Sequence, residues 1–254
     1  MDSIDAERVA ALYDIHGNLP ALDAALAAAD AAGADTIVIG GDVVLGPMPG
    51  ETLDRLLALG PRVRFIRGNC DRLVVDAFDG RPLTPLPPAV REPILWAAGR
   101  LDRRQRDFLA ALPETLGARL PRLGEVLFCH ASPRNDEEIF TVRSPAERVR
   151  PMLDGVTQPV VVCGHTHMQF DRLVDGVRLI NAGSVGMPFG GPGAYWLLLD
   201  RDARLMRTDY DIGRAAELVR STEYPQVEAF LTPFTEEQAL ALFEPPGPAR
   251  AAER

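Results

Sequence analysis

The chain has 254 residues, of which 46% are hydrophobic and 25% are charged, as in an ordinary soluble globular protein with one large α/β domain or two small ones. The net charge of −9 argues against a protein that binds nucleic acid or an anionic membrane by bulk attraction, and all 27 basic residues are arginines, which excludes a lysine nucleophile. No apolar stretch approaches membrane-spanning length, the first residues form no secretory signal, and three cysteines without framework spacing fit a reducing compartment. We therefore expect a cytoplasmic protein.

Strands and helices alternate in the first 70 residues. Apolar runs predict strands over 9–13, 36–39 and 63–66, and helical spacing predicts helices over 19–32 and 51–59. This alternation indicates a βαβ arrangement with largely parallel strands, which carry functional residues at their carboxyl ends. Those ends hold Asp14, His16, Asp42 and Asn69.

Residues 72–122 interrupt this alternation. Five prolines fall within residues 81–93, and residues 94–112 have helical spacing. We expect a mainly helical insertion, at about 72–122, in a single domain that spans 1–254. Arg103, Arg104 and Arg106 are expected to form a solvated face, and contact with a substrate phosphate is the alternative.

The second half is predicted to be rich in strands. Strands are expected over 126–129, 160–163, 170–174, 177–180, 195–199 and 205–208, with a helix over 146–153. Asp175-Gly176 predicts a tight hairpin and therefore antiparallel pairing. A helical region over 211–231, broken near Pro225, precedes a tail that we expect to fray from about residue 245.

Every histidine of the chain lies at the end of a predicted strand. The four are His16, His130, His165 and His167. A His-x-His pair alone is equally compatible with a polar loop, but Asp14, Asp42 and Asn69 occupy equivalent positions. The seven side chains provide mixed nitrogen and oxygen ligands, which suit Mn, Fe, Zn or Ni better than Ca or Mg. Seven ligands are too many for one four-coordinate ion, but they fit two ions that share a carboxylate, the usual device for in-line displacement at phosphorus.

The order of these motifs resembles the calcineurin-like metallophosphoesterases. The residues that carry the resemblance are Asp14-x-His16, Gly41-Asp42, Gly68-Asn69, His130 and Gly164-His165-x-His167, and Asn181–Gly186 is similar to a loop of the small prokaryotic members. The resemblance implies a four-layer α/β/β/α sandwich of two mixed sheets. It also implies that Asp14, His16 and His167 bind one divalent ion, that Asn69, His130 and His165 bind a second, and that Asp42 bridges them.

One position departs from the common family pattern. Many members have a histidine after the motif asparagine as the proton donor for the leaving group, whereas this chain has Cys70. A neutral thiol is a poor acid for this step, so we expect phosphodiesters or phosphoanhydrides to be preferred over alkyl monoesters. Asp71 or a water could replace the missing acid. Cys70, Cys129 and Cys163 are more consistent with packing than with a zinc-thiolate site.

The sequence therefore predicts a two-metal phosphohydrolase, with manganese the preferred ion, that acts by a metal-bridging hydroxide on a small, nucleotide-type substrate. Asp42, Asn69, His130 and Asp71 are the predicted catalytic residues. Arg67 and Arg134 are candidates for binding the substrate phosphate, and surface ion pairing is their alternative. Asp42-Val43 in place of Asp-Arg-Gly argues against a protein phosphatase. A phosphomonoesterase and a non-catalytic interaction scaffold are the alternatives, and the oligomeric state stays open.

Overall fold

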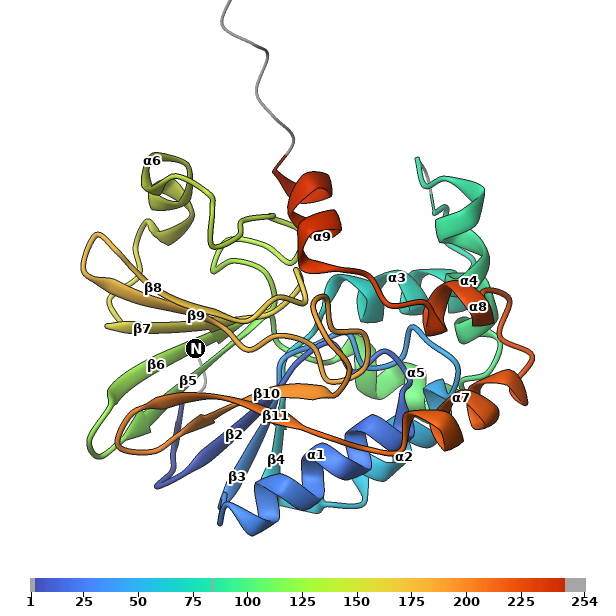
Figure 1. Ribbon diagram of the computed structural model, residues 1–254, viewed down its shortest axis with the longest axis horizontal. Coiled ribbons are helices and arrows are strands. Elements are labelled where there is room, and N and C mark those ends of the chain that lie inside the picture. The colour runs from blue at the N-terminus through green and yellow to red at the C-terminus, as the bar shows by residue number, and fades with distance from the viewer. Residues whose placement is uncertain (1–2, 84, 245–254) are drawn as a thin grey trace, which may run out of the picture.

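Two mixed β-sheets face each other at the centre of the molecule (Figure 1). The computed structural model describes residues 3–83 and 85–244. One sheet has the strand order β1-β5-β6-β7-β9-β8 and the other has the order β11-β10-β2-β3-β4. The six-stranded sheet consists of β1 (Ser3–Asp5), β5 (Thr115–Leu120), β6 (Gly124–Cys129), β7 (Val160–Cys163), β8 (Phe170–Val174) and β9 (Val177–Asn181). The five-stranded sheet consists of β2 (Val9–Leu12), β3 (Thr36–Ile39), β4 (Val63–Phe65), β10 (Ala194–Leu199) and β11 (Ala203–Thr208).

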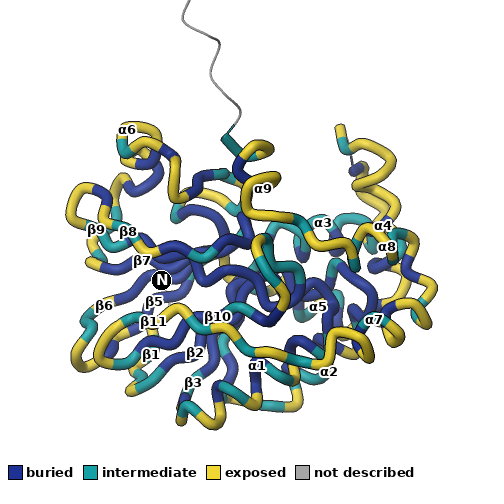
Figure 2. Tube along the Cα trace, in the orientation of Figure 1, coloured by how far each residue is buried: buried dark blue, intermediate teal, exposed yellow. Residues whose placement is uncertain are grey.

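The inner faces of the sheets form one apolar core. Val9, Ala11 and Tyr13 at one sheet pack in the same cluster as Phe128 and Val162 of the other. Both faces of the central strands are buried, as the dark blue strands in Figure 2 show. Continuous apolar runs such as residues 160–163 reflect this double burial.

Helices cover the outer face of each sheet. The five-stranded sheet shares an apolar cluster with α1 (Leu19–Ala31), α2 (Pro49–Leu57), α3 (Asn69–Phe78), α4 (Pro88–Ala98) and α5 (Arg103–Ala110). The six-stranded sheet packs against α6 (Ala146–Val149) and the 3-10 helix η2 (Arg150–Leu153). A further 3-10 helix, η1 (Gly60–Arg62), precedes β4. The expected four-layer sandwich of two mixed sheets is therefore confirmed.

The segment 72–122 differs from the expectation in two respects. The predicted helix over 94–112 is two helices, because a new capping box begins at Asp102 and Gln105 after α4 has ended at Gly99. Residues 115–120 form β5, which pairs antiparallel with β6 and parallel with β1. Gly117 and Ala118 give this strand few of the β-branched residues by which a strand is recognised, so neither β5 nor its short partner β1 was expected.

The C-terminal region contains more separate helices than expected. The segment 211–231 forms α7 (Ile212–Arg220) and α8 (Val227–Leu231), which confirms the interruption near Pro225. A further helix, α9 (Glu236–Phe243), was not predicted. Asp175 and Gly176 both have positive φ, at 48° and 87°, and form the expected hairpin between β8 and β9. The tail expected to fray from about residue 245 lies outside the described residues.

Parallel pairing determines where the site forms. Strand β3 lies between β2 and β4 and is parallel to both, and β6 is parallel to β7. The carboxyl ends of neighbouring parallel strands meet at one edge of a sheet, so the loops after these strands gather there. Across the described parts of the chain, no helix has the length and apolar character needed to cross a membrane.

Candidate metal centre

The seven candidate ligands follow five strands from both sheets. Asp14 and His16 come after β2, Asp42 comes after β3, and Asn69 begins α3 after β4. His130 follows β6, while His165 and His167 follow β7. The structure brings these loops together, because ligand atoms from different loops lie within a few ångströms of one another.

Asp14, His16 and His167 form one group of possible ligands. Their ligand atoms lie within 4.8 Å of one another, and all three residues are buried. The Nε2 atoms of His16 and His167 are 3.1 Å apart, and His167 Nε2 is 3.5 Å from Asp14 Oδ1. This is the group that the family resemblance assigns to the first ion.

Asp42, His130 and His165 form a second group. Here too the ligand atoms lie within 4.8 Å of one another. His130 Nε2 is 3.4 Å from Asp42 Oδ2 and 3.0 Å from Asn69 Oδ1. Asp42 Oδ2 is also 3.8 Å from His16 Nε2, so Asp42 lies between the two groups, where a bridging ligand is required.

An unpartnered carboxylate oxygen indicates that this centre suits a cation. Asp14 is fully buried, and its Oδ1 has no hydrogen-bond partner. The Nε2 atoms of His167, His130 and His16 surround this oxygen at 3.5, 3.9 and 4.0 Å. A buried anionic oxygen without a partner is costly, and a divalent ion would satisfy it together with the imidazoles.

Backbone carbonyls orient three of the four imidazoles. The Nδ1 atoms of His16, His130 and His167 lie 3.0, 2.8 and 2.8 Å from the carbonyl oxygens of Leu45, Gly40 and Met187. Each Nδ1–H therefore donates to a carbonyl, and Nε2 is the nitrogen that faces the centre. Such outer hydrogen bonds fix the tautomer and direction of metal-binding histidines.

The backbone at the ligands is strained. Asp14, His16, Asp42, His165 and His167 have φ values of 53°, 49°, 55°, 66° and 58°, a region that residues other than glycine seldom adopt. In the described residues, only two other non-glycine positions, Asp175 and Glu223, share this conformation. Strain concentrated at one set of polar residues is typical of a functional site.

The carboxylates of the centre raise the pKa of two imidazoles, those of His130 and His167, whereas the pKa values of His16 and His165 are lowered. Burial lowers the pKa of His130, but the carboxylates of Asp42 and Asp14 outweigh that effect and raise it to about 10. The same attraction keeps the pKa of Asp42 well below its usual range despite burial. Burial and the positive charge of His130 lower the pKa of His165 to about 4.

Asp71 does not occupy the position expected of a proton donor. It is fully buried, and its two oxygens accept hydrogen bonds from the backbone N–H groups of Asp42, Val43, Val44 and Gly68 at 2.8–3.2 Å. Burial and the charge of Asp42 raise the pKa of this carboxyl to about 6. The geometry does not support the expected role, because both oxygens of Asp71 hold the loop that carries Asp42.

The three cysteines fall into two classes. Cys129 and Cys163 are fully buried in an apolar cluster, as the packing interpretation predicts. Cys70 is half-buried, and its Sγ belongs to a group of possible ligand atoms with His16 and Asp42. Its backbone N–H donates to Asp42 Oδ1 at 2.8 Å. The packing interpretation is therefore incomplete for Cys70, because its thiol lies at the border of the candidate metal centre.

The candidate phosphate-binding arginines are paired with carboxylates. Arg67 contacts Glu114 at 2.6 Å, and Arg134 forms an ion pair with Glu138 four residues later. Both contacts match the ion-pair alternative. The arginines of α5 pair with Asp107, Asp54 and Asp79, which agrees with a solvated face.

The sequence did not predict the groups that form hydrogen bonds to the ligand residues and their loops. Besides the three carbonyls, the Ser184 hydroxyl donates to the Asp14 carbonyl at 2.7 Å, and Asn181 Nδ2 donates to the Gly164 carbonyl at 2.6 Å. Backbone carbonyls leave no trace in a sequence. The available signal was the polar pair formed by Asn181, the last residue of β9, and Ser184 three residues later.

Comparison with known proteins points to one family. The sequence profile of the calcineurin-like phosphoesterase superfamily domain matches residues 8–204. The chain is 28% identical over 198 residues to the phosphodiesterase YfcE of Escherichia coli, covering 74% of this chain and 85% of that protein. A metallophosphoesterase structure from Sphaerobacter thermophilus has a TM-score of 0.68 at 26% identity and covers 89% of this chain and 98% of its own. A Pyrococcus horikoshii structure has a TM-score of 0.76 at 22% identity, with 88% and 97% covered, and supports the fold alone.

Proposed function

Because the chain belongs to the calcineurin-like phosphoesterase family and is a metal-dependent phosphoesterase, we propose that it hydrolyses phosphodiester or phosphoanhydride bonds of a small substrate at a pair of divalent ions. The observation that carries this proposal is the unpartnered Asp14 Oδ1 among three Nε2 atoms, beside a second group built around Asp42. All seven candidate ligands are present. An enzyme needs the full set, whereas a non-catalytic scaffold of the same fold does not.

The ligands divide between two ions in the proposed centre. Asp14, His16 and His167 would hold one, Asn69, His130 and His165 would hold the other, and Asp42 would bind both. Such a pair of ions, with manganese the preferred metal, supplies an activated water and positive charge for the phosphoryl oxygens. The protein contributes the fixed direction of the imidazoles through the carbonyls of Gly40, Leu45 and Met187.

The surroundings of Asn69 favour substrates with good leaving groups. The residue after Asn69 is Cys70, and burial together with the charge of Asp42 raises the pKa of its thiol well above the usual value. Asp71 is enclosed by backbone N–H groups. Neither side chain is suited to protonate an alkoxide, so bonds whose leaving groups need little help are the better substrates. The relative YfcE is named a phosphodiesterase, which supports the same class.

Activity in Mn²⁺ tests this proposal. The purified full chain, freed of metal by a chelator, should be inactive on bis(p-nitrophenyl) phosphate and should recover with Mn²⁺. Asp42→Asn and Asp14→Asn should each lower kcat by about 10²-fold or more while the fold is retained. Asp23→Asn is the matched control, because Asp23 lies on α1 with a side chain 51% exposed. Full turnover in either site variant would refute the assignment.

A further inference from the structure

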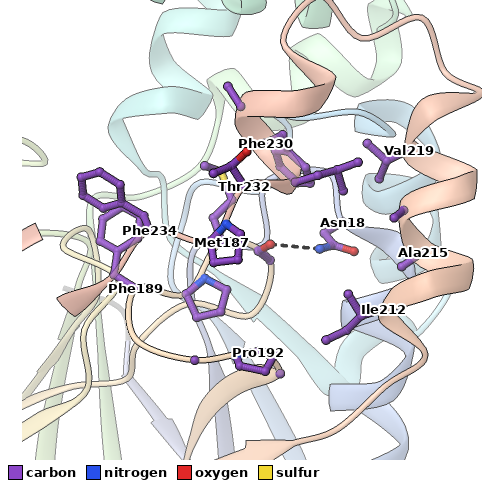
Figure 3. A pocket seen from close by; sticks show the side chains of 18 of the residues that line it. Asn18, Met187, Phe189, Pro192, Ile212, Ala215, Val219, Phe230, Thr232 and Phe234 are labelled. Atoms are coloured by element: carbon purple, nitrogen blue, oxygen red, sulfur yellow. Dashed lines mark hydrogen bonds between the residues drawn. The ribbon is translucent and has the colours of Figure 1, made fainter. Parts of the chain in front are cut away.

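A cavity of about 560 Å³ lies beside the metal centre, between the loop 186–193 and the C-terminal helices (Figure 3). Its volume is within the range of roughly 300–1,000 Å³ typical of small-molecule sites. Helices α7 and α8 form one side of it, and the chain around Pro192 forms the other. The helical side lies beyond residue 204, where the match to the family profile ends.

The lining of the cavity is apolar and aromatic. Met187, Phe189, Phe230 and Phe234 are among the residues that line it (Figure 3), and no acidic or basic side chain is found among its lining residues in the described chain. A charged ligand group would therefore be buried without a counter-charge, at a cost of several kcal/mol. The lining selects a neutral molecule.

The polar side chains of the lining are already engaged by the protein. Asn18 Nδ2 donates to the Gly186 carbonyl at 2.9 Å and to the Tyr210 hydroxyl at 3.3 Å. The Thr232 hydroxyl donates to the Glu228 carbonyl at 2.6 Å. Because the Asn18 amide and the Thr232 hydroxyl already donate within the protein, the ligand need not supply acceptors for them. Aromatic rings on the ligand could instead pack against the three phenylalanines.

The rim of the cavity exposes large apolar side chains. Ile212 is 44% exposed and Leu242 is 63% exposed, and both line the cavity. A bound apolar molecule would remove part of this surface from water, at roughly 25 cal/mol for each Å².

The wall of the cavity also positions a candidate metal ligand. The Met187 carbonyl accepts the Nδ1–H of His167, and the Phe189 ring lies 4.7 Å from the His167 ring, measured between centroids. Phe189 in turn contacts the ring of Phe234 at 4.9 Å. His167 Nε2 faces Asp14 on the opposite side of the imidazole. An occupant of the cavity would therefore touch residues that set the direction of His167.

We propose that this cavity is an allosteric site for a small, neutral aromatic molecule, and that its occupancy changes the affinity of the centre for metal through Met187, Phe189 and His167. The coupling rests on the proposed metal centre, whereas binding to the cavity does not. Linkage requires that the metal change the affinity for the aromatic molecule by the same factor.

Binding is tested with N-phenyl-1-naphthylamine, a neutral fluorescent aromatic amine, added to the full chain. Saturable binding to one site is expected, and Ile212→Asp should weaken it by about tenfold or more because a carboxylate would border the apolar lining. Leu218→Asp is the matched control, since Leu218 lies on the same helix, is 42% exposed and does not line the cavity. Ala216→Trp, which fills the cavity, provides a second blocking variant.

Three results would overturn the proposal. The first is the absence of saturable binding, including the case in which a second copy of the chain covers the cavity, as sedimentation would show. The second is equal affinity in Ile212→Asp, Ala216→Trp and the control. The third is a Mn²⁺ affinity that changes by less than about twofold at saturating probe, where about fivefold or more is expected. Failure of the proposed function is distinguishable, because Mn²⁺ would then neither bind nor support diester hydrolysis, whatever the probe does.

Discussion

The close approach of the chain at Gly164 gives a specific test of how the ligands are held. A Cβ at this position would lie 2.5 Å from Asp14 Oδ2 and 2.5 Å from Cδ1 of the buried Tyr13 ring, whereas real Cβ contacts are essentially never closer than 3.0 Å. Tyr13 is fully buried and its hydroxyl donates to the Val162 carbonyl, so its ring has little room to move. In Gly164→Ala, the Asp14 carboxylate must therefore shift by about half an ångström or more.

This displacement should affect both stability and activity. Overpacking of a tightly packed site costs about 1–3 kcal/mol in free energy of unfolding. A misplacement of nearly 1 Å can lower turnover by about 10²-fold, so we expect kcat/KM for a phosphodiester to fall by about 10- to 100-fold. The affinity for Mn²⁺ should fall as well, because Asp14 Oδ2 also accepts the backbone N–H of His165 at 2.9 Å.

The measurements are diester kinetics, Mn²⁺ titration and thermal unfolding of the purified variant. Gly99→Ala is the matched control, because Gly99 has a φ of −69° and an added Cβ would meet only ordinary contacts at 3.5 Å. The control should retain wild-type kinetics. Wild-type metal affinity and turnover in Gly164→Ala would refute the argument that this glycine leaves space for the Asp14 carboxylate.

Three further predictions concern protons and the loop at Asp42. Because Asp42 and Asp14 raise the pKa of His130 to about 10, the metal-free protein carries a proton there at pH 8, and Mn²⁺ must displace it. Affinity for Mn²⁺ should therefore rise with pH up to about 10. Calorimetry in buffers of different ionisation enthalpy should detect the released proton, and binding of Mn²⁺ without proton release would contradict this prediction. Cys70→His places an imidazole beside Asn69 and should raise monoester turnover by about tenfold or more relative to diester turnover, whereas an unchanged ratio would show that a proton donor is not what is missing. Asp71→Asn replaces one carboxylate oxygen by an amide nitrogen that backbone N–H groups of the Asp42 loop would face. We expect a loss of about 2–4 kcal/mol in the free energy of unfolding, measured by chemical denaturation. A loss below about 0.5 kcal/mol would show that Asp71 does not hold this loop.

The regular elements and the candidate ligands were predictable because their signals are local. The runs 36–39 and 170–174 became strands with the expected bounds, and every histidine lies in a loop after a strand. Parallel pairing then brings the loops of each sheet to one edge of that sheet. The split into two ligand groups came from the family resemblance, and the positions of Asp14 and Asp42 agree with it.

Other features depend on tertiary contacts that leave little trace in the sequence. Strand β5 contains Gly117 and Ala118 and is stabilised by pairing with β6 and β1 rather than by its own propensity. Asp71 was considered, together with a water, as the replacement proton donor because Cys70 takes the place of the usual histidine. Only the fold shows that four backbone N–H groups surround it. The cavity similarly combines Asn18 with residues about two hundred positions later in the chain.

Electron paramagnetic resonance of the Mn²⁺-loaded full chain tests the central proposal most directly, because it distinguishes a pair of neighbouring ions from a single one. We predict a spin-coupled signal at two equivalents of Mn²⁺ per chain, which Asp42→Asn should abolish by removing the shared carboxylate. A signal of isolated Mn²⁺ that saturates at one equivalent would contradict a two-metal centre formed by Asp14, His16, Asp42, Asn69, His130, His165 and His167.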